Sequence, residues 1–224
     1  MNTPTIDALM NDKETLIRLK DQEPLNGGAT RLVFSHPHEP NWIIKVIRPD
    51  IIEKRYGKKA SRFRFKRRRR AGKYNSFDRE VREYFVGYAE IGTAPPFVQE
   101  IVGFCHTDMG LGLISCAIKR KDGSLAFSIN ELIKRRQYTH KMSVLLEEIE
   151  CELLNSKMIF SDLNLGAIVH DEKNNRFVMV DGLGVTNPIP IKAMSCRLNR
   201  RSKKKKFSKL RRKIDHLKAE HNYL

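Results

Sequence analysis

The chain of 224 residues lacks any apolar run near the ~20 residues that a membrane-spanning helix needs. Its opening, MNTPTIDALMNDKE, also lacks the basic and then apolar order of a secretion signal. From these two absences we expect a protein with no transmembrane segment that resides in the cytoplasm.

Cysteine is scarce, and no two of the four cysteines form a CxxC pair. Their neighbours are mostly apolar, which favours buried, reduced core side chains over metal ligands or disulfides. The four are Cys105, Cys116, Cys151 and Cys196.

Acidic residues are missing from two stretches of the chain. Residues 54–73 and 192–213 each hold 12 Lys or Arg and no acid. Outside them 19 basic residues stand against 26 acidic ones, so a mildly acidic body carries two polycationic segments and the total is +17. Such segments bind phosphates, and Phe63 and Phe65 within the first could stack on unpaired bases.

The partner of the basic segments stays open at this point. RNA, DNA, an anionic membrane surface and an acidic protein all fit the charge. Solvated tails without a partner fit it too. Neither segment contains a base-reading module, which argues against specific recognition of bases.

The length suits one domain or two small lobes, and a hydrophobic content of 40% supports a core. The most informative stretch is 159–184, in which a polar turn separates the apolar residues 168–169 and 177–180. This pattern predicts a β-hairpin with Asp162 in the loop before it and Asp181 at its end. Because antiparallel strands bring their outer ends together, the two carboxylates should be neighbours. Beside the DGLG segment they could hold a divalent cation that carries a phosphate, although a surface hairpin with acidic ends is the alternative.

Other patterns predict further elements. Residues 30–35 and 42–47 should form a hairpin, with Gly27 and Gly28 at its entrance. Apolar spacing predicts a helix over 77–88 with Ser76 as N-cap, and it carries Glu80 and Glu83. Two more strands are expected at 96–104 and 112–119, and helices at 129–133, 139–156 and 211–224.

Taken in order, these elements resemble those of a protein-kinase-like fold. Over about residues 25–186 the chain resembles the YrbL family of PhoP regulatory network proteins, compact relatives of protein kinases. The resemblance implies an α+β, reduced kinase-like bilobal fold. Its antiparallel-sheet N-lobe would span 1–121, with a basic insertion at 54–73. A small, mostly helical C-lobe would span 122–190, and a basic C-terminal segment 191–224.

The resemblance also implies roles for single residues and ATP and Mg²⁺ as cofactors. Lys45 in WIIKVI resembles the lysine that holds the ATP phosphates, with Glu80 as its helix partner and Glu83 as the fallback. Asp162 resembles the aspartate that orients the accepting hydroxyl, and Asp181 the aspartate that holds the metal. Gly27 and Gly28 would lie over the phosphates. Cys116 and Ile118 would border the adenine at a hinge.

The sequence departs from the kinase loop pattern at three positions. Ala167 stands where a metal-binding asparagine is usual, Phe160 where a histidine is, and Asn164 where a lysine is. Asn164 could replace the missing ligand or contact the γ-phosphate. Fewer than about 45 residues follow Asp181, too few for a large peptide-docking lobe.

Two hypotheses therefore stand. The first is an ATP-dependent phosphotransferase with an unknown acceptor. The second is an inactive pseudokinase regulator that binds nucleic acid or another polyanion through its basic segments.

Overall fold

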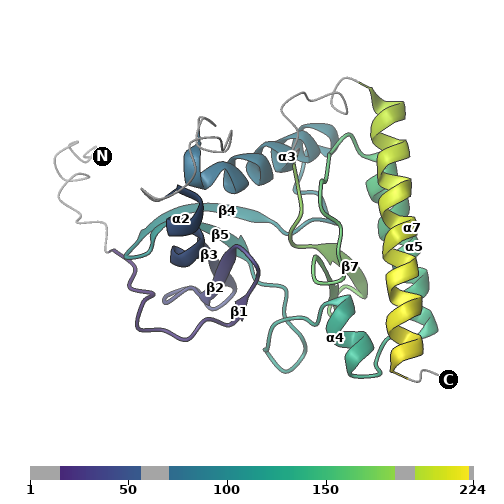
Figure 1. Cartoon of the computed structure of the whole chain (residues 1–224), viewed down its shortest axis with the longest axis horizontal. Helices are drawn as coiled ribbons and strands as arrows, with labels where there is room; N and C mark the ends of the chain where they lie inside the picture. The colour runs from purple at the N-terminus through teal and green to yellow at the C-terminus, as the bar shows by residue number, and fades with distance from the viewer. Residues whose placement is uncertain (1–15, 57–70, 185–194, 222–224) are drawn as a thin grey trace, which may run out of the picture. The chain divides into compact units, whose positions relative to one another are not determined.

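The computed structural model describes residues 16–56, 71–184 and 195–221, which form two compact units (Figure 1). The first unit draws on residues 1–74 and 102–116, and the second on 75–101 and 117–224. The first contains an antiparallel sheet, and the second is mostly helical. The predicted α+β class is thereby confirmed.

The first unit is built on a five-stranded sheet with the order β1-β2-β3-β5-β4. Gly27 lies within its first strand rather than only at the entrance of a hairpin. The predicted pair of strands at 30–35 and 42–47 is confirmed as β2 and β3. The elements are β1 (Asn26–Gly27), β2 (Arg31–Ser35), β3 (Trp42–Ile47), β4 (Ile101–Thr107), β5 (Gly110–Cys116), α2 (Pro49–Tyr56) and the 3₁₀ helix η2 (Gly72–Tyr74).

Successive side chains of β3 point to opposite faces of the sheet. Ile44 and Val46 point into a core that also contains Phe34, Ile114 and Leu19. Residues 43 and 45 point to the opposite face, where Lys45 lies between Val33 and Leu113 on the neighbouring strands. Only 5% of Lys45 is exposed, so its ammonium group lies at a buried position rather than at a solvated strand end.

The next two strands differ from their predicted bounds. The strand expected at 96–104 begins at Ile101, because Pro95 and Pro96 have no backbone N–H and the Val98 N–H closes a turn onto the Pro95 carbonyl. The strand expected at 112–119 is β5, which ends at Cys116. Residues 97–99 instead hydrogen-bond to Met179 in the second unit.

The second unit contains a long helix α3 (Asn75–Ile91), two helices α4 (Ile129–Lys134) and α5 (His140–Asn155), the hairpin β6 (Ile168–Asp171) and β7 (Arg176–Met179), and α7 (Cys196–Glu220). The predictions for α4, α5 and the hairpin are confirmed. α3 begins directly after η2, so Ser76 lies inside the helix and the predicted N-cap is wrong.

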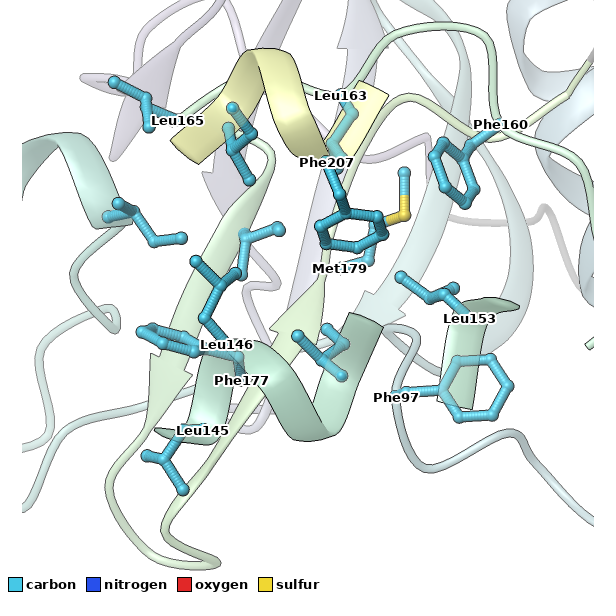
Figure 2. Close-up of a cluster of buried hydrophobic side chains, with 14 of the residues drawn as sticks. Phe97, Leu145, Leu146, Leu153, Phe160, Leu163, Leu165, Phe177, Met179 and Phe207 are labelled. Carbon is cyan, nitrogen blue, oxygen red and sulfur yellow. The ribbon is translucent and has the colours of Figure 1, made fainter. Parts of the chain in front are cut away.

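Helices α5 and α7 run side by side (Figure 1). Figure 2 shows the core that they share with the hairpin, in which Leu146 and Leu153 of α5, Phe177 and Met179 of β7, and Phe207 of α7 lie together. Phe207 is fully buried and meets the ring of Phe160 edge-on. None of the helices in the described ranges is long and apolar enough to cross a bilayer.

The C-terminal helix begins at Cys196, well before the predicted start at Arg211. The run of lysines and arginines hides the apolar stripe of Phe207, Leu210 and Ile214, all buried. This part of the second basic segment is therefore a structural helix of the second unit. The first basic segment falls mostly outside the described residues, and so do Phe63 and Phe65.

The expectation of buried cysteines is wrong. Cys105 and Cys116 are half-buried, and Cys151 and Cys196 are exposed. All four are free thiols in the structure. Cys151 and Cys196 lie on helical faces turned to solvent, and their immediate neighbours in the sequence are polar or charged.

Candidate functional site

The hairpin owes its tight turn to a few polar side chains. The Asp171 carboxylate accepts hydrogen bonds from the backbone and side-chain amides of Asn174. Asn175 has a φ of 46°, in the left-handed region that asparagine tolerates. The register pairs Ile168 with Met179, so the chain enters and leaves the hairpin at the same end.

At that end, the loop carrying Asp162 and the segment carrying Asp181 lie side by side. The backbone N–H groups of Ser161 and Asp162 both donate to the carbonyl oxygen of Gly182, at 3.0 and 3.4 Å. Two residues on, the Gly184 N–H donates to the Ile159 carbonyl oxygen at 2.8 Å. The predicted juxtaposition of these two acidic segments is confirmed.

Glycine is required where the two segments touch. Gly182 has a φ of 90°, and a Cβ there would collide with the carbonyl oxygen of Asp162. Gly184 has a φ of 94°, and a Cβ there would collide with Arg79 of α3. The DGLG sequence therefore allows the strand exit to approach both the Asp162 loop and α3 closely.

The SDLNLG loop alternates between buried and exposed residues. Leu163 and Leu165 enter the hydrophobic core, which fixes the backbone on both sides of Asn164. Asp162 is left exposed, and its Oδ2 accepts a hydrogen bond of 3.4 Å from the Asn164 amide. The Asn164 Oδ1 accepts from the Gly166 N–H at 3.0 Å, which shapes the loop.

The oxygen donors at this end of the hairpin are few. Asp181 is exposed, and its Oδ1 accepts from the Gly182 N–H. Ala167 is buried and offers only its backbone, whose carbonyl accepts from the Val180 N–H. In the described ranges no three His, Cys, Asp or Glu side chains gather as metal ligands. Asp162, Asp181 and Asn164 are the residues here whose side-chain oxygens could hold a cation.

Two glutamates of α3 hold the residues that lead into the Asp162 loop. The Ile159 N–H donates to the Glu83 carboxylate at 2.6 Å, and the Lys157 N–H donates to Glu90 at 2.8 Å. Burial raises the pKa of Glu83, while the Ile159 N–H and the charge of Lys203 oppose that rise. Glu80, the other glutamate named for the nucleotide, lies on the same helix and is also buried, with 4% of its surface exposed.

Helix α7 holds the same residues from their carbonyl side. The Asn199 amide donates to the carbonyl oxygens of Lys157 and Met158, at 3.1 and 3.2 Å. The Lys206 ammonium donates to the carbonyl oxygen of Phe160. Residues 157–160 are thus fixed at both N–H and C=O groups, immediately before Asp162.

Lys203 is the buried cation of α7, with 1% of its surface exposed. Its ammonium donates to the carbonyl oxygens of Leu153 and Ser156, at 2.6 and 2.7 Å, where α5 ends. Burial lowers its pKa to about 8, against the opposing charges of Glu90 and Glu83. Lys203 therefore caps the C-terminus of α5 with a positive charge.

Sequence reasoning missed Asn199, Lys203 and Lys206. The one signal in the sequence is the spacing of Phe207, Leu210 and Ile214, which marks a helical core stripe. Extending that stripe toward the N-terminus would have placed Lys203 on the inner face, one turn before Phe207.

The remaining candidate residues belong mainly to the first unit, apart from Ile118. Gly28 donates its N–H to the Arg31 carbonyl at the β1–β2 turn. Lys45 shares its face of the sheet with Ser115, a fully buried residue whose hydroxyl has no hydrogen-bond partner among the described residues. The chain passes from the first unit to the second directly after Cys116.

One known family accounts for most of the chain. Over residues 17–215 the chain matches the family of the PhoP regulatory network protein YrbL. The chain belongs to the YrbL family. A comparison with curated proteins finds no match.

The extent of the match bears on the C-terminal helix. The YrbL-family region ends at residue 215, so it includes most of α7 and the buried residues Lys203 and Phe207. It also includes the Asp162 loop and the DGLG segment. The helix that holds residues 157–160 is therefore part of the YrbL-family region.

Proposed function

We propose that this YrbL-family protein is an ATP-dependent phosphotransferase of reduced kinase-like fold. The observation that carries the proposal is the pairing of the Asp162 loop with the Asp181 segment through the Gly182 carbonyl oxygen. This pairing places the two exposed carboxylates of Asp162 and Asp181 at one end of a hairpin that packs on a buried core.

The proposed reaction moves the γ-phosphoryl group of ATP to a hydroxyl oxygen of the acceptor. A new P–O bond forms to that oxygen, the bond to the β-phosphate oxygen breaks, and ADP leaves. Asp162 orients the hydroxyl and accepts its proton. Asp181 holds the Mg²⁺ that neutralises the phosphate oxygens, since phosphoryl transfer depends mainly on positioning and charge stabilisation.

Most of the groups proposed for the rest of the nucleotide belong to the first unit, while Glu80 and Ile118 belong to the second. Lys45 binds the α- and β-phosphates, with Glu80 as its partner, and Gly27 and Gly28 allow backbone to approach them. Lys45 lies on a regular strand and is only 5% exposed, a placement that is compatible with this role. Cys116 and Ile118 border the adenine, and the buried Ser115 hydroxyl faces the same side of the sheet as Lys45.

Asn164 supplies the second metal ligand that Ala167 cannot. Its Oδ1 has one lone pair engaged by the Gly166 N–H and one left for a cation. An Asn164→Ala variant with unchanged Mg²⁺-ATP binding and turnover would rule this role out.

One observation favours a second candidate function. Ala167 is buried and apolar at the position where a kinase holds its second metal. A protein with this loop could bind the nucleotide without turning it over. In that case it would act as a regulator, through a polyanion bound at its basic segments.

Phosphate transfer from γ-labelled ATP decides between the two. The purified protein should hydrolyse ATP or label itself, and Asp162→Asn and Asp181→Asn should each lower the rate by at least 100-fold. Glu148→Gln, at an exposed acid of α5, is the matched control and should retain the rate. If the unmodified protein binds Mg²⁺-ATP yet transfers nothing, the regulator is the correct assignment.

A further inference from the structure

The outward face of α7 carries a continuous row of cations. Successive residues of an α-helix are rotated by 100° about its axis. The side of α7 opposite the buried Lys203, Phe207 and Leu210 therefore consists of exposed residues. They include Arg197, Arg201, Lys204, Lys205, Lys209 and Arg212.

Nothing on the described chain neutralises this row. None of the six forms an ion pair with another described residue, and Asp215 is the first acid that follows them on the helix. From residue 197 to residue 212 the row extends about 22 Å at a rise of 1.5 Å per residue. A rigid line of charge of this length creates a strong local field that attracts a polyanion.

The chemistry of the face indicates which polyanion. Leu198 is the only exposed large apolar side chain in the described part of α7, because the other large apolar side chains of the helix pack in the core. This face of α7 therefore lacks the apolar side chains that insert into a membrane. The same described face has no aromatic side chain for stacking on unpaired bases. Charge without apolar or stacking groups suits the sugar-phosphate backbone of a duplex.

The width of the face favours B-form DNA. Cations lie along both edges of the face, Lys204 on one and Lys209 on the other, with Arg201 and Arg212 between them. An α-helix with its side chains is about 10–12 Å across, close to the major groove width of about 12 Å. The major groove of an RNA duplex is too narrow and deep to admit such a helix.

We propose that the outward face of α7 docks on the phosphates that border the major groove of duplex DNA, without reading its sequence. The docking does not depend on the phosphotransferase activity, because the residues before Asp162 contact Asn199 and Phe207, outside the outward face of the helix. Variants Asp162→Asn and Asp181→Asn should therefore bind DNA as the unmodified protein does.

The test is fluorescence anisotropy of a labelled mixed-sequence 20-base-pair DNA duplex with the full chain, at several salt concentrations. The triple variant R201Q/K205Q/R212Q should weaken binding at least tenfold. It should also reduce the slope of log K against log salt by about 0.9 for each phosphate that the variant no longer neutralises. The control triple K121Q/K141Q/K173Q removes the same charge from exposed positions elsewhere and should change the affinity less than threefold.

Three results would overturn the proposal. They are equal losses in the two triples, equal affinity for a duplex RNA of the same sequence, and binding to phosphatidylserine vesicles with none to DNA. If the α7 triple does not fold, lysine acetylation of the unmodified protein replaces it. DNA should then protect Lys204, Lys205 and Lys209 but leave Lys121, Lys141 and Lys173 reactive, and the reverse pattern would contradict the proposal.

Discussion

Gly182 determines how closely the two acidic segments approach. We predict that Gly182→Ala lowers the free energy of unfolding by more than about 3 kcal/mol, because a positive φ and a collision with the Asp162 carbonyl act together. Urea denaturation measures this change.

Gly123→Ala is the matched control for Gly182→Ala. Its φ of 84° imposes a similar backbone strain, but no atom lies within 4 Å of the added Cβ. The control should cost about 1 kcal/mol. Equal losses in the two variants would mean that strain alone matters and that the close approach to Asp162 does not.

Lys203 is the second residue whose role rests on burial. We predict that Lys203→Met lowers the free energy of unfolding by about 1–3 kcal/mol, since the carbonyl oxygens of Leu153 and Ser156 lose their donor. Lys204→Met, at the exposed next position, should stay within about 0.5 kcal/mol of the unmodified protein. A neutral effect of Lys203→Met would show that water replaces the ammonium without cost.

The same residue predicts a pH dependence. The pKa of Lys203 falls from its ordinary 10.5 to about 8 in the folded protein, because of burial. Between these two values the unfolded chain keeps a proton that the folded chain has released, so folding becomes more favourable as the pH rises. The stability of the unmodified protein relative to Lys203→Met should therefore increase from pH 8 to pH 10 in urea titrations. A constant or shrinking difference would contradict the lowered pKa.

At the scale of the element, α7 has a buried apolar face and an exposed cationic face. Phe207→Ala should lower the free energy of unfolding by about 3–5 kcal/mol, because it removes a fully buried ring that packs against Phe160. Leu198→Ala removes an exposed apolar side chain from the same helix and should cost less than about 0.5 kcal/mol. Thermal or urea unfolding followed by circular dichroism compares the two. If Phe207→Ala unfolds like the unmodified protein, α7 is not part of the core.

The elements differ in how well their sequences predict them. The hairpin and α5 are predictable because an apolar period and a polar turn are both local signals. In α7 the charge obscures the helical stripe, and α2 escapes prediction although Pro49 begins it and Asp50 lies in its first turn. Pro95 and Pro96 shift the start of β4, since the apolar residues after them pair with β7 instead.

At the scale of the whole molecule, nucleotide binding is the property to measure. Mg²⁺-ATP bound only to the folded chain should stabilise it by about 2.7 kcal/mol at a concentration of 100 times the Kd. A thermal-shift titration should therefore show a rising Tm with Mg²⁺-ATP, a smaller rise without Mg²⁺, and little rise in Lys45→Met. A Tm that ATP leaves unchanged in the unmodified protein would refute the nucleotide site itself.

The spacing of a few consecutive residues alone determined the hairpin between the two aspartates and the long helix before it. The α+β class came with the resemblance to a kinase-like fold. Only the tertiary structure decided that Glu83 and Asn199 hold the residues before Asp162 and that Lys203 is buried. It also decided that Cys151 and Cys196 face solvent. These outcomes depend on which faces of distant segments pack together. The cost of burying the Lys203 charge, for example, is offset by the carbonyl oxygens of Leu153 and Ser156, which lie far from it in the sequence.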